Sequence, residues 1–128
     1  MRRLAVLSSI LLSVSSAALA ADPTAGATVF KKCAVCHAIG PGAANKVGPE
    51  LNGVIGRKTG SVPGYNYSDA NKNSGIVWTE DELARYIHNP RGIVPGTKMT
   101  FPGIQDDQQV GDLIAYLKTF GPDGQPAP

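Results

Sequence analysis

The chain has 128 residues, with 12 Lys and Arg against 10 Asp and Glu and with only two cysteines. This length allows one small domain and excludes a second, and the near balance of charge excludes a general affinity for nucleic acid. With 15 glycines, ten prolines and few large aromatic residues, the side chains are too small to fill a thick core. The composition therefore indicates that a bulky cofactor supplies part of the core.

The first 20 residues have the layout of a secretory signal peptide. Two arginines give a positive start, residues 4–14 are mostly apolar, and the small-residue sequence Ala-Leu-Ala ends at Ala20. The alternative is an uncleaved anchor helix, but serines dilute the apolar run, which is shorter than the roughly 20 residues that span a bilayer. We expect cleavage after Ala20 and export to the periplasm. Loss of Arg2 and Arg3 leaves ten basic and ten acidic residues in the mature chain.

The first predicted element of the mature chain is a helix that begins at Asp22 and Pro23. Asp22 suits the N-cap, and Pro23 suits the first helical position. Gly26, Phe30 and Cys33 follow at helical spacing on one face. The helix therefore carries the first cysteine at its end.

Residues 38–66 are predicted to be a long loop. They are rich in Gly, Pro, Asn and Lys and show no convincing periodicity. A structureless run of this length is uncommon in a compact domain unless it is functional. Wrapping around a cofactor would explain it.

Two helices are predicted in the middle of the chain. The first is short and runs from a Ser68 cap to Asn73. The second begins at a capping box formed by Thr79 and Glu82 and stops before Pro90. Its apolar face holds Leu83, Tyr86 and Ile87.

The last part of the chain reads as a loop, a helix and a tail. Residues 90–104 contain three prolines and are predicted to be loop. The final helix has the clearest apolar spacing, and Gly121 is its predicted stop. Residues 121–128 are expected to be a disordered tail after a folded domain at 21–120. No alternating strand pattern is visible, so we predict an all-α fold with long loops. The apolar positions of the final helix are Val110, Leu113, Ile114 and Leu117.

The two cysteines stand in the sequence Cys33-Ala-Val-Cys36-His37. This is the attachment motif of a c-type haem, in which two thiols one helical turn apart form thioethers and the histidine binds the iron. A disulfide, a zinc site completed by His88, a thiol redox pair and a chance match are the alternatives. The disulfide would close only a tiny loop, zinc would need adjacent ligands in one tetrahedral site, and a redox pair would need a βαβ pattern.

Met99 is the one methionine of the expected mature chain. A lone methionine usually fills a gap in a core, but Met99 lies in a loop between Pro95 and Pro102. A loop that presents a thioether suits a sixth haem ligand, and a filled sixth site favours an electron carrier over a haem enzyme with an open site. His88 is the competing ligand, although its place before Asn89-Pro90 favours a surface position.

The sequence resembles class I cytochrome c, in the group of mitochondrial cytochrome c and bacterial cytochrome c2. The resemblance extends over residues 24–120 and includes the segments CAVCH, GPELNGVIGRKTG, PGYNYSDANKNSGIVW, YIHNP, PGTKMTFPGI and DLIAYLK. It implies four to five helices and long loops around one haem c. The haem would be covalent through Cys33 and Cys36, with His37 and Met99 as axial ligands. It also implies an electron-transfer protein, not an enzyme.

The resemblance further implies roles for residues around the haem. The carbonyl of Pro49 would accept a hydrogen bond from His37, and Tyr86 would lie near the sulfur of Met99. Positions near the haem propionates or a buried water match Arg57, Tyr67, Trp78, Asn71 and Thr97. The expected contact of the first and last helices involves Gly26, Phe30, Leu113 and Tyr116.

The resemblance implies a docking face for redox proteins near the haem edge. Parts of a basic ring match Lys32, Lys46, Arg91 and Lys98. Other ring positions hold Gly92, Gln105, Asp106 and Asp107, which thins the charge that steers association. A quinol-oxidising complex, a terminal oxidase, a reaction centre or a periplasmic dehydrogenase would each suit a monomeric carrier of this kind.

Overall fold

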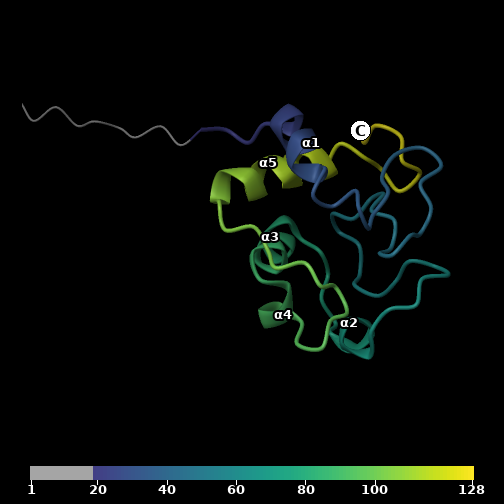
Figure 1. Ribbon diagram of the computed structural model, residues 1–128. Helices are drawn as coiled ribbons and strands as arrows, with labels where there is room; N and C mark the ends of the chain where they lie inside the picture. Colours follow the sequence, from purple (N-terminus) through teal and green to yellow (C-terminus); the bar gives the residue numbers. More distant parts are fainter. Residues whose placement is uncertain (1–18) are drawn as a thin grey trace, which may run out of the picture.

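A computed structural model of the protein describes residues 19–128 (Figure 1). Its helices are α1 (Pro23–Phe30), α2 (Asp69–Asn73), α3 (Glu80–His88), α4 (Pro90–Ile93) and α5 (Asp107–Leu117). Within these residues there are two isolated bridges and no strand, so the predicted all-α class is confirmed. The predicted signal peptide lies outside the described residues except for its last two. None of the described helices combines the length and apolar character that crossing a bilayer requires.

The crossing of α1 and α5 is the most extensive helix–helix contact among the described residues (Figure 1). α1 begins as predicted, because the Asp22 side chain accepts a hydrogen bond from the Thr24 amide and Pro23 follows. Gly26 faces α5 so closely that an added Cβ would lie 2.8 Å from Cβ of Tyr116. A side chain at position 26 would therefore separate the helices. The seam is completed by Phe30, whose ring centroid lies 5.4 Å from that of Tyr116.

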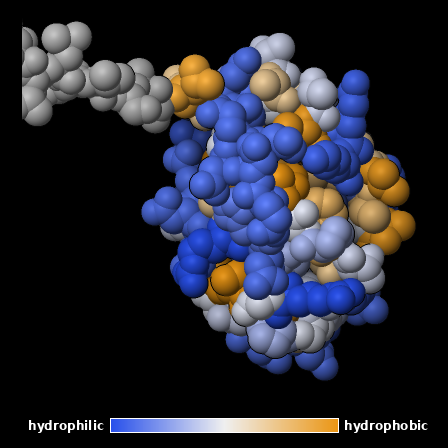
Figure 2. Space-filling model, turned by 60° about the vertical axis from the view of Figure 1, so that its left-hand side comes forward, coloured by the Kyte–Doolittle hydropathy of each residue, from blue (hydrophilic) through white to orange (hydrophobic). Residues whose placement is uncertain are grey.

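The core joins one face of α3 to one face of α5. The predicted apolar positions of both helices are buried, with Leu113 only 1% exposed. The helical spacing of apolar residues in the sequence therefore identified the buried faces of both helices correctly. The buried apolar residues of these two helices are Leu83, Tyr86, Ile87, Val110, Leu113, Ile114 and Leu117. On the face shown in Figure 2, hydrophilic side chains cover most of the surface and apolar ones form separate patches.

Two local predictions in the second half of the chain need correction. The Thr79 side chain accepts from the Glu82 amide as expected, but the Glu82 carboxylate instead pairs with Arg85 at 3.2 Å, so the capping box is half formed. The expected loop at 90–104 begins with the short helix α4. Asn89 caps that helix by accepting from the Gly92 amide, and Pro90 occupies its first position. Proline therefore ends one helix here and starts the next.

The end of the chain also differs from expectation. α5 ends at Leu117 with Lys118 as its cap, four residues before the predicted stop at Gly121. The segment 121–128 turns back, where the Gly121 amide donates to the Gln125 carbonyl and the Ala127 amide to the Thr119 carbonyl. Backbone hydrogen bonds of this kind are not encoded by a side-chain pattern, so the sequence did not indicate them.

Candidate cofactor site

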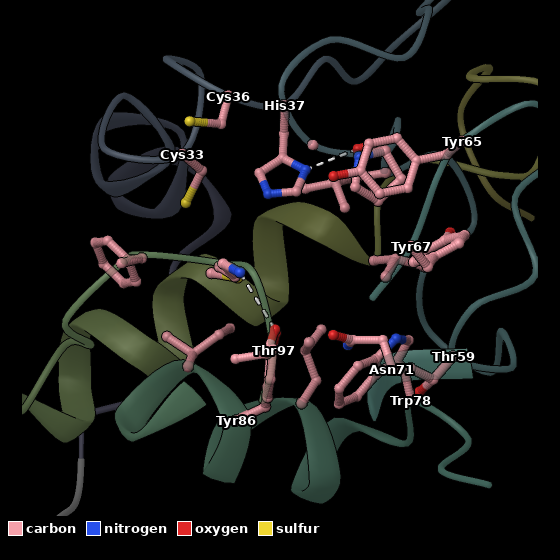
Figure 3. Close-up of a pocket in the computed structure, with 18 of the residues that line it drawn as sticks. Cys33, Cys36, His37, Thr59, Tyr65, Tyr67, Asn71, Trp78, Tyr86 and Thr97 are labelled. Carbon is pink, nitrogen blue, oxygen red and sulfur yellow. Dashed lines mark hydrogen bonds between the residues drawn. The ribbon is translucent and has the colours of Figure 1, made fainter. Parts of the chain in front are cut away.

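A cavity of about 360 Å³ lies between the loops and the α3–α5 core. Figure 3 shows the cysteines and His37 on one side of it and Tyr86, Thr97 and Asn71 on the other. Every site residue named from the sequence lines this one cavity, although the positions span 67 residues of chain. They are Cys33, Cys36, His37, Pro49, Arg57, Tyr67, Asn71, Trp78, Tyr86, Thr97 and Met99.

The first side of the cavity, which we call the His37 wall, is built by residues 33–57. Nδ1 of His37 lies 2.7 Å from the Pro49 carbonyl oxygen. A carbonyl only accepts, so Nδ1 carries the proton and Nε2 presents a lone pair to the cavity (Figure 3). Gly48 permits this arrangement, because an added Cβ would lie 2.7 Å from Nδ1 of His37. The expected hydrogen bond to Pro49 is therefore present.

Burial lowers the pKa of His37, and the charges of Arg57 and Lys46 lower it further against the opposing effect of the Pro49 hydrogen bond. The ring is therefore kept neutral at ordinary pH. Neutral imidazole is the form that binds a metal ion.

The two thiols are free and face the cavity (Figure 3). Burial raises the pKa of the Cys33 thiol to about 11, with Lys32 opposing and Cys36 adding to the shift. A thiol held protonated is a poor nucleophile, which disfavours the thiol redox alternative. Within residues 19–128, no three His, Cys, Asp or Glu side chains gather as a metal cluster, which disfavours zinc.

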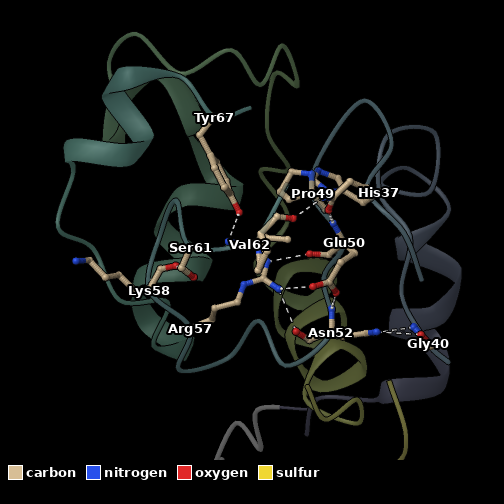
Figure 4. A network of polar contacts seen from close by, with 12 residues as sticks. His37, Gly40, Pro49, Glu50, Asn52, Arg57, Lys58, Ser61, Val62 and Tyr67 are labelled. Atoms are coloured by element: carbon tan, nitrogen blue, oxygen red, sulfur yellow. Dashed lines mark hydrogen bonds and ion pairs between the residues drawn. The ribbon is translucent and has the colours of Figure 1, made fainter. Parts of the chain in front are cut away.

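Arg57 ties the loop of the His37 wall together (Figure 4). Its guanidinium donates to the carbonyls of Asn52 at 3.0 Å and Glu50 at 2.9 Å and pairs with the Glu50 carboxylate at 3.5 Å. Asn52 in turn exchanges two hydrogen bonds with the backbone of Gly40. Burial lowers the pKa of Arg57, and the Glu50 charge opposes that shift. Hydrogen bonds from polar side chains therefore fix the shape of this loop, whose sequence has no periodic pattern.

Tyr67, Asn71 and Trp78 also line the cavity. The Tyr67 hydroxyl accepts from the Val62 amide at 3.1 Å, and burial raises the pKa of Tyr67 against this bond and the Arg57 charge. The Asn71 side chain accepts from the Ser68 hydroxyl at 2.7 Å. Trp78 packs against Tyr86, with ring centroids 4.7 Å apart.

The opposite side of the cavity, the Met99 wall, consists of residues 94–106 in front of α3. The Tyr86 and Thr97 hydroxyl oxygens lie 3.1 Å apart, and Thr97 also accepts from the Met99 amide at 3.3 Å. Met99 itself is half-buried and packs against the core. The thioether therefore belongs to a segment that a hydroxyl pair holds to α3.

His88 does not line the cavity. Its Nδ1 lies 2.7 Å from the Ile104 carbonyl oxygen and its Nε2 3.2 Å from the Asp107 carboxylate. Both ring nitrogens are thus occupied outside the cavity. This agrees with the expected position at the surface and removes His88 as the competing sixth ligand.

Thr59 is a cavity residue that the sequence analysis missed. Within the described residues, its hydroxyl is the one fully buried side-chain polar atom without a hydrogen-bond partner. Its place beside Arg57 in GRKTG was the available signal. An orphaned hydroxyl that lines a cavity calls for a polar partner from a ligand.

The cavity residues fit a haem. The iron of a c-type haem can take a neutral imidazole and a thioether as ligands, and its two vinyl groups form thioethers with thiols. A buried hydroxyl at Thr59 and the cation of Arg57 suit its carboxylates. The aromatic and aliphatic lining suits the flat ring, as expected for a site that encloses an apolar cofactor.

The four basic residues predicted at a docking face are all exposed. Three of them contact neighbouring groups: Lys32 donates to the Gln109 side chain at 3.0 Å, Lys46 to the Ala34 carbonyl at 2.8 Å and Lys98 to the Asn66 carbonyl. Lys98 also lies over the ring of Tyr65, with Nζ 4.8 Å from the centroid. The fourth is Arg91, on α4.

Comparison with known proteins agrees with this geometry. The family model for cytochrome c matches residues 23–121. Cytochrome c2 from Blastochloris viridis is 54% identical over 97% of this chain and 98% of its own, and cytochrome c2 from Rhodoplanes tepidamans is 61% identical over 81% and 97%. The structure of cytochrome c2 from Rhodospirillum centenum matches with a TM-score of 0.75 and 40% identity over 79% of this chain and 99% of that one. Since the family match extends over most of the chain and the first two relatives are 54% and 61% identical to it, the chain belongs to the cytochrome c family, in its class I group.

Proposed function

We propose that this chain is an exported carrier of single electrons whose one haem is attached through Cys33 and Cys36 and ligated by His37 and Met99. Membership of the cytochrome c family makes the chain an electron-transfer protein rather than an enzyme and implies a covalent haem c. The ligand residues, the attachment residues and the cleavage after Ala20 are our inference.

The observation that carries the proposal is the meeting of two distant segments at one cavity. Two thiols and a neutral imidazole come from the His37 wall, and a thioether comes from the Met99 wall. These donors form the set that a closed, six-coordinate c-type haem requires. The tautomer set by the Pro49 carbonyl leaves Nε2 of His37 free to bind the metal.

When bound, haem supplies one-electron chemistry between ferrous and ferric iron. The protein's part is to orient His37, to hold Met99 opposite it and to exclude water through apolar walls. A thioether ligand raises the reduction potential, and an occupied sixth position leaves no site for a substrate.

We further propose that redox partners dock at the face that carries Lys32, Lys46, Arg91 and Lys98. These side chains are exposed, and two of them, Lys32 and Lys98, lie at the edge of the cavity. A quinol-oxidising complex, a terminal oxidase, a reaction centre or a periplasmic dehydrogenase would suit a monomer in the periplasm. Weak, brief contacts suit a shuttle.

The attachment is tested by expressing the chain with cytochrome maturation machinery and staining a denaturing gel for haem. We expect stained protein from the wild type and none from a Cys33→Ala/Cys36→Ala double variant. Unstained wild-type protein would contradict covalent attachment.

The ligation is tested with Met99→Ala. The variant should keep its covalent haem, have a lower reduction potential and bind added imidazole or carbon monoxide. The oxidised wild type should show the weak far-red absorption band of a methionine–iron bond. An unchanged potential in the variant would mean that Met99 is not the ligand.

A further inference from the structure

The trailing end of the Met99 wall is fastened to the C-terminal end of α3. In Figure 1 the segment that leads into α5 passes beside α3. The Ile104 amide donates to the Ile87 carbonyl at 3.0 Å, and the Gln105 side chain donates to the His88 carbonyl at 3.0 Å. Gly103 permits this contact, since an added Cβ there would lie 3.1 Å from the Ile87 carbonyl oxygen. The backbone at 103–105 is thus in direct contact with the last turn of α3.

The His88 ring bridges this contact to α5. Its Nδ1 faces the Ile104 carbonyl oxygen at 2.7 Å, and its Nε2 faces an Asp107 carboxylate oxygen at 3.2 Å. A carbonyl oxygen and a carboxylate are both acceptors, so both ring nitrogens must donate to satisfy them. Only the imidazolium form does so. A neutral ring keeps the shorter bond to Ile104 and loses the contact with Asp107.

The other charged groups near this bridge are engaged elsewhere or lie on other sides. On α3, Arg85 pairs with Glu82. On the loop, the Asp106 side chain caps α5 by accepting from the Gln109 amide. On α4, the one charged residue is Arg91. Among residues 19–128, Asp107 is the charged group at ion-pair distance from the His88 ring.

We propose that His88 is a positioning residue for Met99. Its ring holds the trailing end of the Met99 wall to α3, and these contacts are strongest when the ring is protonated. The proposal rests on the proposed function, in which Met99 binds the iron. The leading end of the same wall is held to α3 by Tyr86 and Thr97. One helix thereby fastens both ends of the loop that carries the sixth ligand.

The two ring nitrogens can be separated with a pair of matched variants. The amide nitrogen of His88→Asn takes the place of Nδ1 and can still donate to the Ile104 carbonyl. That of His88→Gln takes the place of Nε2 and can reach Asp107 but not Ile104. The two variants differ by the one neutral hydrogen bond to Ile104. At pH 8 we therefore expect hydrogen exchange at the Ile104 amide to be about three- to tenfold faster in the glutamine variant than in the wild type and nearly unchanged in the asparagine variant.

Hydrogen exchange at the Gly56 amide serves as an internal control. This amide donates to the Trp78 carbonyl at 2.7 Å, just before the N-cap of α3 and therefore at the other end of that helix from His88. Its exchange should be the same in all three proteins. Faster exchange at both amides would indicate global destabilisation and overturn a local role for His88.

The link to Met99 is measured with imidazole as an added ligand of the oxidised holoprotein. Imidazole binds when Met99 leaves the iron, so its apparent affinity follows the population of the opened loop. We expect affinity to rise about three- to tenfold in His88→Gln and to stay within about twofold in His88→Asn. Equal affinity in the wild type and His88→Gln overturns the positioning role, even if exchange at Ile104 changes.

The protonation dependence is tested by comparing exchange at pH 5 and at pH 8. Because only the imidazolium form keeps the pair with Asp107, the protection of the Ile104 amide, corrected for intrinsic exchange, should be about two- to threefold higher at the lower pH in the wild type. Asp107→Asn should abolish this dependence and leave the protection at pH 8 unchanged. A wild-type profile as flat as that of Asp107→Asn overturns the protonation link.

The far-red band of the oxidised wild type separates this proposal from the proposed function. If the band is absent throughout the pH range, Met99 is not the ligand and both proposals fall. If the band is present and imidazole affinity is indifferent to His88→Gln, only the positioning role is overturned.

Discussion

The two walls of the cavity are held in different ways. The His37 wall is braced within one stretch of chain, by the bond between His37 and Pro49 and by the bonds of Arg57 to the backbone of residues 50 and 52. The Met99 wall has few internal bonds and is fastened to α3 through Tyr86 and His88. A wall braced by nearby residues keeps its shape when distant contacts are lost, whereas one fastened to another element can open by itself. The iron ligands should therefore differ in how readily they leave.

The largest expected effect comes from Gly26→Ala, which loosens the seam behind both walls. The added methyl would lie 2.6 Å from the Asp112 carbonyl carbon and 2.8 Å from Cβ of Tyr116, so α1 and α5 must separate. We expect the free energy of unfolding to fall by about 3 kcal/mol, measured by denaturant titration.

Gly111→Ala is the matched control on α5. An added Cβ there meets only Ala21, at 3.9 Å. Since alanine is the better helix former, this variant should be stabilised by about 0.5–1 kcal/mol. Destabilisation of both variants to the same extent would contradict the close-approach argument.

Gly48→Ala should distort the His37 wall and leave the Met99 wall unchanged. The methyl would lie 2.7 Å from Nδ1 of His37, and the ring must move away from the Pro49 carbonyl. We expect a loss of about 2 kcal/mol in the free energy of unfolding and a changed environment of the His37 ring, measured by denaturant titration and by NMR of the imidazole. The neighbouring Val47→Ala, at a position that is 75% exposed, should change stability by less than about 0.5 kcal/mol.

Thr97→Val should weaken the Met99 wall alone. The substitution removes the partner of the Tyr86 hydroxyl and the acceptor for the Met99 amide. We expect a loss of about 1 kcal/mol and a lower denaturant midpoint for the far-red band than for global unfolding. Coincident transitions in the variant would show that the Met99 wall does not open separately. Thr119→Val is the control, since the exposed Thr119 hydroxyl donates only to the nearby Tyr116 carbonyl.

The smallest effect is expected from Lys118→Ala, which tests whether surface charge supports either wall. Nζ of Lys118 lies 3.0 Å from the Glu80 carboxylate, and both side chains are about half exposed. The pair joins the end of α5 to the start of α3. We expect a loss of about 0.5 kcal/mol at low salt that disappears at high salt, measured by thermal unfolding. A loss that persists at high salt would indicate that packing of the Lys118 stem is responsible.

Much of the fold could be predicted because its signals are local. Asp22 and Pro23 mark the start of α1, Ser68 caps α2, and the apolar spacing around Leu113 identifies the buried face of α5. The turn contacts at the end of the chain could not be predicted in the same way. They are backbone hydrogen bonds between residues with no apolar pattern, and only the folded chain brings them together.

The site shows the same division. The spacing of Cys33, Cys36 and His37 and the loop position of Met99 were visible in the sequence. The orphaned hydroxyl of Thr59 and the two acceptors around His88 were not visible. A side chain's partners depend on which distant backbone groups reach it, and residue type alone does not specify them.

The amino-acid sequence by itself determined the helical class and the cysteine–histidine motif, because a helix of 3.6 residues per turn places side chains on a face without reference to the rest of the chain. Most of the other residues that line the cavity were expected only from the resemblance to class I cytochrome c. Only the tertiary structure decided that α3 fastens both ends of the Met99 wall and that Ile104 and Asp107 are the partners of the His88 ring. Those outcomes depend on contacts between residues far apart in the chain, whose geometry is set when the elements pack.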